Sequence, residues 1–550
     1  MLGVSTLYRG GFVYTPIDPF ANAMVVDEAT GTIAWIGGDD AAAVHVDAVD
    51  EVVELDGALV APAFVDAHAH VSQTGAGLRG VDLGATRSVV EALSRIEDAA
   101  RRSQGRPVYA PNWDQDHWAE HRPHTGAELD RATYGGVVYS PRVDGHSAVI
   151  SSALAAASGA RGLPGWEGDG LVTRDAHHAA REAFNGAVTP AQRQADIDLA
   201  LRAAAAAGIG LVQENGGRTL SGTDDFAEVL AAGERGDGPQ TLGYWAQLVS
   251  DEAEARDVAT LRGARGLAGD LNIDGSVGSR TAHLREPYTD AAGHTGNAYL
   301  TVEQVRDHVA ACSLAGLQAG FHVIGDAGVD TAVAGFEAAA ELVGAPVVTR
   351  ARHRLEHLEM VSRDGIERLV RLGVGASVQP AFDAFWGGDR GMYAARLGAD
   401  RVHGRTGGDT APMNAFASMM AAGMTVAFGS DSPVTPFAPW EAVRAAAFHH
   451  DESQRVSARS AFLAHTRGGW RAAGFEDRGY LDLGLPATFA VWEVGDLVVQ
   501  APDDRIQTWS TDPRSGTPGL PDLSPGMPAP TCQRTVVRGR TVFDSGTLGA

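Results

Sequence analysis

Short apolar runs alternate with longer helical stretches through the middle of this chain. Eight runs have the character of strands and end in polar residues: FVDAHAH (64–70), IGLVQEN (209–215), LGYWAQLV (242–249), DLNIDGS (270–276), LQAGFHVIGD (317–326), RHRLEHLE (352–359), GVGASVQP (373–380) and MTVAFGSD (424–431). Most of them are separated by an alanine-rich segment of helix length. This repeated alternation predicts an α/β fold, specifically a (β/α)8 barrel, or TIM barrel.

The two ends of the chain follow a different pattern. Both consist of short strands separated by Gly, Asp and Asn turns, as in NAMVVDE and GTIAWIGG near the start and RTVVRGRTVFDSG near the end. Strand-rich ends on either side of a barrel favour one β domain built from both. We therefore predict a small β-sandwich domain from residues 1–60 plus 486–550, and a barrel domain over residues 61–485.

One gap between the apolar runs is much longer than a barrel helix requires. The segment from about residue 75 to residue 208 lies between the first two runs. It contains strand-like pieces of its own, RPVYAPNW and GGVVYSPRVDGH. Loops that follow barrel strands lie over the mouth of the barrel. We predict a large insertion after barrel strand 1 that covers the mouth and shapes a site there.

Composition narrows the function classes. The net charge of −25 argues against a nucleic-acid partner, whose phosphates would be repelled. No apolar run is long enough to cross a membrane and the start lacks a signal-peptide pattern, so we expect a cytoplasmic protein without a membrane partner. All 44 Lys and Arg residues are arginine, which excludes a lysine nucleophile or a carboxylated-lysine metal ligand. Cys312 and Cys532 are too few for a disulfide scaffold or a cysteine zinc site.

Polar residues at the ends of the runs form a candidate site. Asp66, His68 and His70 alternate along run one and so share a face, while the other candidates are Asp270 in run four, His322 in run five, His357 in run six and Asp431 in run eight. An HxH pair arises readily by chance among 19 histidines, and a lone histidine is more often a core or surface residue. Convergence of all these residues at one end of a barrel makes a metal site the better interpretation, because imidazoles and carboxylates together bind Zn²⁺ or a similar ion.

Motifs in order along the chain resemble those of the metal-dependent amidohydrolases. The sequence is similar to the amidohydrolase-3 group, which includes N-substituted formamide deformylases. The matching stretches are APAFVDAHAH, RVDGHSAVISSAL, IDGSVGSRTAHLREPY, FHVIGD, RLEHLE, SVQP and GSDSPV, between about residues 60 and 440. Among these stretches, IDGSVGSRTA and GSDSPV are individually specific for the family. The resemblance also implies the small β domain and a homodimer.

The resemblance implies roles for the candidate residues. His68 and His70 bind the more buried metal, often with Asp431, and His322 and His357 bind a second metal or contact the substrate. Members with two metals have a bridging residue on strand four, often a carboxylated lysine, and this chain has Asp270 there. Three alternatives follow: Asp270 bridges two metals, the site holds one metal, or metal binding is weak or lost. Zn²⁺ is the expected ion, with Mn²⁺ or Fe²⁺ as alternatives.

The resemblance further implies a hydrolase that uses metal-activated water on a non-peptide C–N bond, in an amide, an N-substituted formamide or a cyclic amide. Asp431 acts as general base and then acid, His322 stabilises the oxyanion, and His146, in VDGHSAV, faces the small-molecule substrate. Hydrolysis of an ester or lactone on the same site is one alternative, and a non-catalytic barrel scaffold is another.

Some neighbouring residues receive secondary expectations. Asp274 and Thr281 are expected to structure the loop after strand four, Asp326 to orient a metal ligand, and the role of Arg280 stays open between structure and substrate contact. Aromatic residues near the expected mouth favour an apolar or aromatic substrate; they are Trp113, Trp118, Trp166, Trp245, Phe382, Phe385, Trp386 and Trp440.

Overall fold

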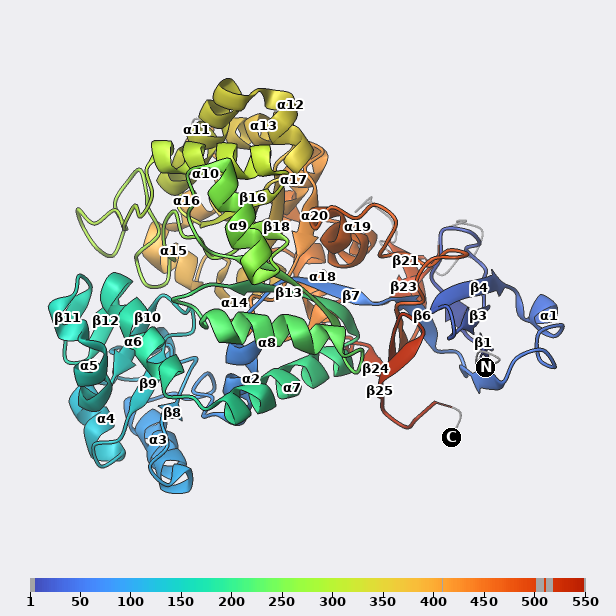
Figure 1. Cartoon of the computed structure of the whole chain (residues 1–550), viewed down its shortest axis with the longest axis horizontal. Coiled ribbons are helices and arrows are strands. Elements are labelled where there is room, and N and C mark those ends of the chain that lie inside the picture. Colours follow the sequence, from blue (N-terminus) through green and yellow to red (C-terminus); the bar gives the residue numbers. More distant parts are fainter. Residues whose placement is uncertain (1–4, 408, 501–508, 511–517, 549–550) are drawn as a thin grey trace.

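A parallel eight-stranded sheet forms the centre of the computed structural model, which describes residues 5–407, 409–500, 509–510 and 518–548. In sheet order its strands are β7 (Phe64–Ala69), β13 (Ile209–Gly216), β14 (Gln240–Trp245), β15 (Gly266–Leu267), β16 (Gln318–Val323), β17 (Arg354–His357), β18 (Gly375–Val378) and β19 (Val426–Phe428). The Asp431 N–H donates to the carbonyl of His68 (2.7 Å) and the His70 N–H to that of Ser432 (2.8 Å), which joins the first strand to the last. The predicted (β/α)8 barrel is confirmed (Figure 1).

The fourth barrel strand lies earlier in the chain than the sequence analysis placed it. β15 covers only Gly266–Leu267, and the predicted run, 270–276, is mostly loop with one isolated bridge from Asn272. Gly269 has a φ of 80°, which turns the chain away from the sheet. Asp270 therefore lies on a loop beyond the strand end rather than within a strand.

Helices cover the outside of the barrel. They include α2 (Val71–Arg79), α7 (Pro190–Ala206), α8 (Thr223–Glu234), α9 (Glu252–Arg262), α10 (Val302–Ala315), α11 (Asp326–Val343), α13 (Arg363–Arg371) and α18 (Pro439–Ala447). Local sequence sets their ends: Thr301 and Gln304 form a capping box at the start of α10, and Thr189 caps α7 ahead of Pro190. Among the described residues, no helix is long and apolar enough to span a membrane.

Strands from both ends of the chain share one small β domain. A four-stranded sheet has the order β4 (Thr32–Gly37), β3 (Ala23–Asp27), β1 (Ser5–Arg9), β5 (Glu51–Glu54); a five-stranded sheet has the order β2 (Phe12–Val13), β6 (Leu59–Pro62), β20 (Phe489–Glu493), β24 (Thr531–Val537), β25 (Arg540–Asp544). Met24, Val60 and Phe489 lie in one buried cluster between them. A short sheet adds β22 (Trp509–Ser510), β21 (Leu497–Gln500) and β23 (Leu520–Pro521). The predicted stretch 486–550 includes 501–508, 511–517 and 549–550, which lie outside the described residues, and the predicted domain limits stay a prediction.

The segment between β7 and β13 contains a sheet of its own. Its strands are β11 (Trp166–Gly168), β12 (Leu171–Thr173), β10 (Ser147–Ile150), β9 (Val138–Pro141) and β8 (Val108–Tyr109), and its helices are α3 (Val89–Ser103), α4 (Gly126–Ala132), α5 (Ser152–Ser158) and α6 (Arg174–Gly186). We call this segment, from Val89 to Gly186, the insertion. Figure 1 shows it at the end of the molecule opposite the small β domain. The helix α7 follows it and packs beside α2 on the barrel.

The contact between α2 and α7 allows a test of the fold next to the site. An added Cβ at Gly75 on α2 would lie 1.8 Å from the carbonyl oxygen of Asp196 on α7. We expect Gly75→Ala to lower the free energy of unfolding by about 1–3 kcal/mol, measured by denaturant or thermal unfolding, because the helices must separate.

Gly77→Ala on the same helix is the matched control. Its Cβ would meet only Pro433, at 3.7 Å, so it should leave stability unchanged or slightly raised. Equal losses in the two variants would contradict the packing described here.

Candidate metal centre

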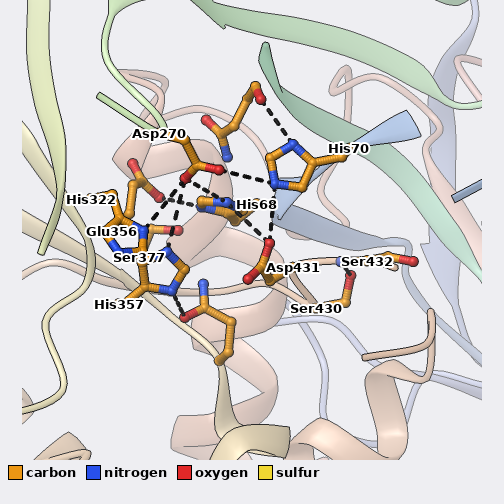
Figure 2. Close-up of polar contacts among 12 residues, drawn as sticks. His68, His70, Asp270, His322, Glu356, His357, Ser377, Ser430, Asp431 and Ser432 are labelled. Carbon is orange, nitrogen blue, oxygen red and sulfur yellow. Dashed lines mark hydrogen bonds and ion pairs between the residues drawn. The ribbon is translucent and has the colours of Figure 1, made fainter. Parts of the chain in front are cut away.

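Two histidines and two aspartates converge at the carboxyl end of the barrel strands (Figure 2). The Nε2 atom of His68 lies 3.3 Å from Oδ1 of Asp270 and 3.3 Å from Oδ1 of Asp431. The Nε2 atom of His70 lies 3.2 Å from Oδ2 of Asp270 and 3.2 Å from Oδ1 of Asp431. All four side chains are largely or fully buried.

These spacings match the donor shell of a metal ion. Ligand atoms about 2.0–2.1 Å from a tetrahedral ion lie about 3.3 Å from one another, which is the separation seen here. Nε2 of His68, Oδ1 of Asp270 and Nε2 of His357 are buried and have no hydrogen-bond partner among the described residues. Buried polar atoms without partners are costly, so their grouping indicates a cation site. The donor set fits a divalent metal.

Each cluster histidine has its other ring nitrogen held by an acceptor. Nδ1 of His68 donates to Glu356 (2.9 Å), Nδ1 of His70 to the carbonyl of Asn215 (2.9 Å), and Nδ1 of His357 to Oε1 of Gln379 (2.9 Å). Nε2 of His322 lies 3.3 Å from the carbonyl of Gly275, which leaves Nδ1 facing Asp270. These bonds fix the tautomers so that each histidine directs a lone pair into the cluster.

Glu356 is itself held by a buried arginine. Arg354 donates to both carboxylate oxygens of Glu356, at 2.6 and 2.9 Å, and also to the carbonyl of Ala67 (2.7 Å). Burial alone would raise the pKa of Glu356, but the charge of Arg354 and the hydrogen bond from His68 lower it to about 2. Glu356 is therefore an ionised acceptor that keeps a proton on Nδ1 of His68.

The cluster carboxylates stay ionised despite their burial. Desolvation opposes ionisation, but the imidazoles of His68 and His70 hold the pKa of Asp431 and of Asp270 below the usual range. In return, and again against burial, the two aspartates raise the pKa of His70 to about 10. Binding of a divalent cation here would therefore compete with protonation of His70.

Two residues of the cluster have strained backbones. His357 has a φ of 68° and Asp431 a φ of 55°, in the left-handed region. This conformation costs about 1 kcal/mol or more for a residue with a side chain, and it is concentrated at functional sites. His357 ends β17, and Asp431 lies three residues beyond the end of β19.

His322 and His146 extend the cluster toward the insertion. The rings of His322 and His357 lie 4.3 Å apart between centroids, and those of His322 and His146 lie 4.8 Å apart. Nδ1 of His322 and Nε2 of His357 are 3.8 and 3.9 Å from Oδ1 of Asp270. Burial and the neighbouring His322 lower the pKa of His146 to about 3, so its ring is neutral at pH 7. The structure thus brings all six predicted metal-binding residues and His146 together.

A pair of loops holds His146 in this position. Asp144, two residues before it, accepts hydrogen bonds from the hydroxyls of Ser276 and Ser279 (both 2.8 Å) and from Arg142 (2.9 Å). The two serines belong to IDGSVGSRTA and Asp144 belongs to RVDGHSAV, so two of the motifs noted in the sequence contact each other. This contact fastens the insertion to the barrel at the mouth.

One pocket connects the cluster with the insertion. The barrel contributes His70, Asp270, Asn272, His322, His357, Asp431, Pro433 and Val434, and the insertion contributes Tyr109, Tyr139, Arg142, Val143, Asp144, His146, Arg174, His177, His178 and Arg181, among others. The insertion therefore forms one wall of the candidate site.

One neighbouring residue, Asp326, differs from its sequence-based expectation. Asp326 accepts the backbone N–H of Arg285 (2.9 Å) and contacts no cluster histidine among the described residues, so the expected orienting role is wrong. Arg280 pairs with Asp290 (2.6 Å), a structural contact. Asp274 binds the backbone N–H groups of His283, Ile324 and Gly325 at 2.7–2.9 Å, as expected of a loop residue.

Four of the eight predicted aromatic residues belong to the cores of the insertion and the barrel. Trp113 and Trp118 pack inside the insertion, Trp245 and Trp440 pack in the barrel core, and Phe385 is 56% exposed. Two others, Phe382 and Trp386, do border the cluster in an adjoining hollow. The sequence analysis missed Gln379, whose side chain holds His357 and which lies near the end of an apolar run. It also missed Asn215, which holds His70 through its backbone carbonyl, a role that the residue type does not signal.

Comparison with known proteins agrees with this geometry. The model of the amidohydrolase family matches residues 51–543. The chain belongs to the amidohydrolase family. Family membership together with the His/Asp cluster makes it a metal-dependent hydrolase.

Three relatives are 24–26% identical to this amidohydrolase. It is 26% identical over 527 residues to the putative amidohydrolase YtcJ of Bacillus subtilis, covering 89% of this chain and 94% of that protein. It is 24% identical to protein LONG AFTER FAR-RED 3 of Arabidopsis thaliana, covering 88% and 86% of the two chains. An uncharacterised metal-dependent hydrolase from Pyrococcus furiosus, 24% identical, superposes with a TM-score of 0.68 over 88% of this chain and 98% of that one, which shows the shared fold.

Proposed function

We propose that this metal-dependent hydrolase cleaves a non-peptide carbon–nitrogen bond in a small-molecule amide, N-substituted formamide or cyclic amide. One observation carries the proposal: the cluster donors have the spacing of a coordination shell and open into a pocket walled by the insertion. A bound divalent ion, which we propose to be Zn²⁺ with Mn²⁺ or Fe²⁺ as alternatives, would supply an activated water and polarise a carbonyl group.

The protein's own groups would then move protons and position the substrate. Asp431 is ionised, so it can accept a proton from the attacking water and deliver it to the leaving nitrogen. His146 is neutral and lies beside His322 at the pocket, so it can hydrogen-bond a substrate carbonyl without adding charge. His322 has Nε2 on the carbonyl of Gly275 and Nδ1 toward Asp270, so it would stabilise the developing negative charge on the substrate oxygen through a metal ion that it holds.

We propose that Asp270 bridges two metal ions. Its Oδ2 faces His70 and its Oδ1 faces His68, His322 and His357, so its two oxygens point to different donors. His68, His70 and Asp431 would hold one ion, and His322 and His357 the other. A carboxylate of Asp270 would thereby take the place of a carboxylated lysine in a chain that has no lysine.

An apolar hollow beside the cluster supports an apolar or aromatic substrate group. It shares His146, His322, His357 and Asp431 with the main pocket, and its other walls include Val277, Ile324, Phe382, Trp386, Met392 and Tyr393. Aromatic and aliphatic walls of this kind bind apolar groups by removing their surface from water.

Loss of the proton-transfer group should stop turnover while the fold remains. Asp431→Asn keeps the size of the side chain but is a far weaker base, so we expect kcat for an amide substrate to fall by about 10²–10⁴-fold at saturating Zn²⁺. Asp326→Asn, which changes an aspartate outside the cluster, should retain activity. Near-wild-type turnover in Asp431→Asn, with metal content unchanged, would contradict the assignment.

The bridging role of Asp270 predicts a specific metal stoichiometry. Elemental analysis of protein loaded with Zn²⁺ should find two ions per chain in the wild type and one in Asp270→Ala, because the outer pair, His322 and His357, loses its carboxylate. Two ions in both proteins would show that Asp270 is not the bridge. One ion in the wild type would favour the single-metal alternative.

A further inference from the structure

The arginines on the pocket wall formed by the insertion differ in whether a carboxylate neutralises them. Three arginines line the pocket: Arg142, Arg174 and Arg181. Arg142 is buried and neutralised by Asp114, Asp116 and Asp144, at 2.9–3.3 Å. Among the described residues, neither Arg174 nor Arg181 has a carboxylate within ion-pair distance.

Within the pocket itself no anion remains to balance these two arginines. Its acidic lining residues are Asp144, Asp270 and Asp431. Asp144 is occupied by Arg142 and two serine hydroxyls, and the other two belong to the metal cluster. Two uncompensated guanidinium groups therefore face the pocket of a protein whose net charge is −25.

The surroundings of Arg181 suit an anionic ligand. Arg181 uses Nε on the carbonyl of Thr219 (2.8 Å), and its two terminal nitrogens make no hydrogen bond among the described residues; its side chain lines this pocket and a second one. The adjacent His178 is uncharged, because burial and Arg181 together lower its pKa to about 4. Tyr109 lines the same wall, and its hydroxyl has no hydrogen-bond partner among the described residues.

We propose that Arg174 and Arg181 bind a carboxylate on the substrate, at the end of the pocket away from the apolar hollow. This inference rests on the proposed hydrolysis of a C–N bond and specifies its substrate class. The substrate is an amide with an apolar or aromatic group on one side of the scissile bond and a carboxylate on the other. Guanidinium groups match carboxylates by paired, charge-assisted hydrogen bonds.

Matched substrates with and without the charge test this proposal. N-benzoylglycine and N-benzoylglycinamide differ only in the carboxylate, and N-phenylsuccinamic acid and its neutral diamide reverse the direction of the amide. At least one acid should have a kcat/KM roughly tenfold or more above its neutral partner, since a hydrogen bond to a charged group contributes about 1.5–3 kcal/mol.

Arginine variants locate the effect. Arg174→Gln and Arg181→Gln should each raise KM for the acid by roughly tenfold or more and leave kcat/KM for the neutral amide nearly unchanged. Arg218→Gln is the control: Arg218 has an 80% exposed side chain paired with Glu182 outside this pocket, so the same loss of charge should change neither substrate.

The outcomes separate this inference from the proposed function. If acids and neutral amides are hydrolysed equally well, and the arginine variants behave like Arg218→Gln, the carboxylate site is wrong while C–N hydrolysis stands. If no amide is hydrolysed, calorimetric binding of N-benzoylglycine to the metal-loaded protein decides: binding weakened by Arg174→Gln and Arg181→Gln supports the carboxylate site and counts against C–N hydrolysis. Binding that the variants do not weaken overturns the carboxylate site.

Discussion

The hydrogen bond on the outer nitrogen of each cluster histidine is the interaction on which the site depends. To bind a metal, each of the four imidazoles must present the lone pair of its inner nitrogen, and the acceptor on its outer nitrogen holds the remaining ring proton there. Glu356, Gln379 and the carbonyls of Asn215 and Gly275 enforce this state. The buried Arg354 in turn keeps Glu356 ionised, so the barrel interior contributes directly to the properties of His68 at its mouth.

The barrel topology brings the cluster residues together, and the insertion encloses the pocket beside them. Parallel strands end at one rim, so residues hundreds of positions apart, such as His68 and Asp431, meet there. The insertion is fastened to that rim by Asp144 and the serines of the loop after β15. The pocket wall formed by the insertion carries arginines and tyrosines, whereas the metal-binding candidates lie on the barrel.

Much of the barrel and of the cluster could be predicted from the sequence, because both depend on local pattern. Seven predicted runs coincide with barrel strands, and their polar ends supplied His68, His322 and Asp431. The fourth run failed because β15 is only two residues long and the apolar pattern continues into a loop held by Asp274. The pairing states of Arg142 and Arg181 were beyond sequence reasoning, since a salt bridge between distant loops leaves no mark on local periodicity.

The most direct test of the account is a crystal structure of the Zn²⁺-loaded protein with anomalous scattering measured at the zinc edge. We predict an anomalous peak about 2.0–2.2 Å from Nε2 of His68, Nε2 of His70 and a carboxylate oxygen of Asp431, with the hydrogen bond from Nδ1 of His68 to Glu356 intact. A fully loaded crystal with no peak between these three side chains, or with a peak at Nδ1 of either histidine, would contradict it.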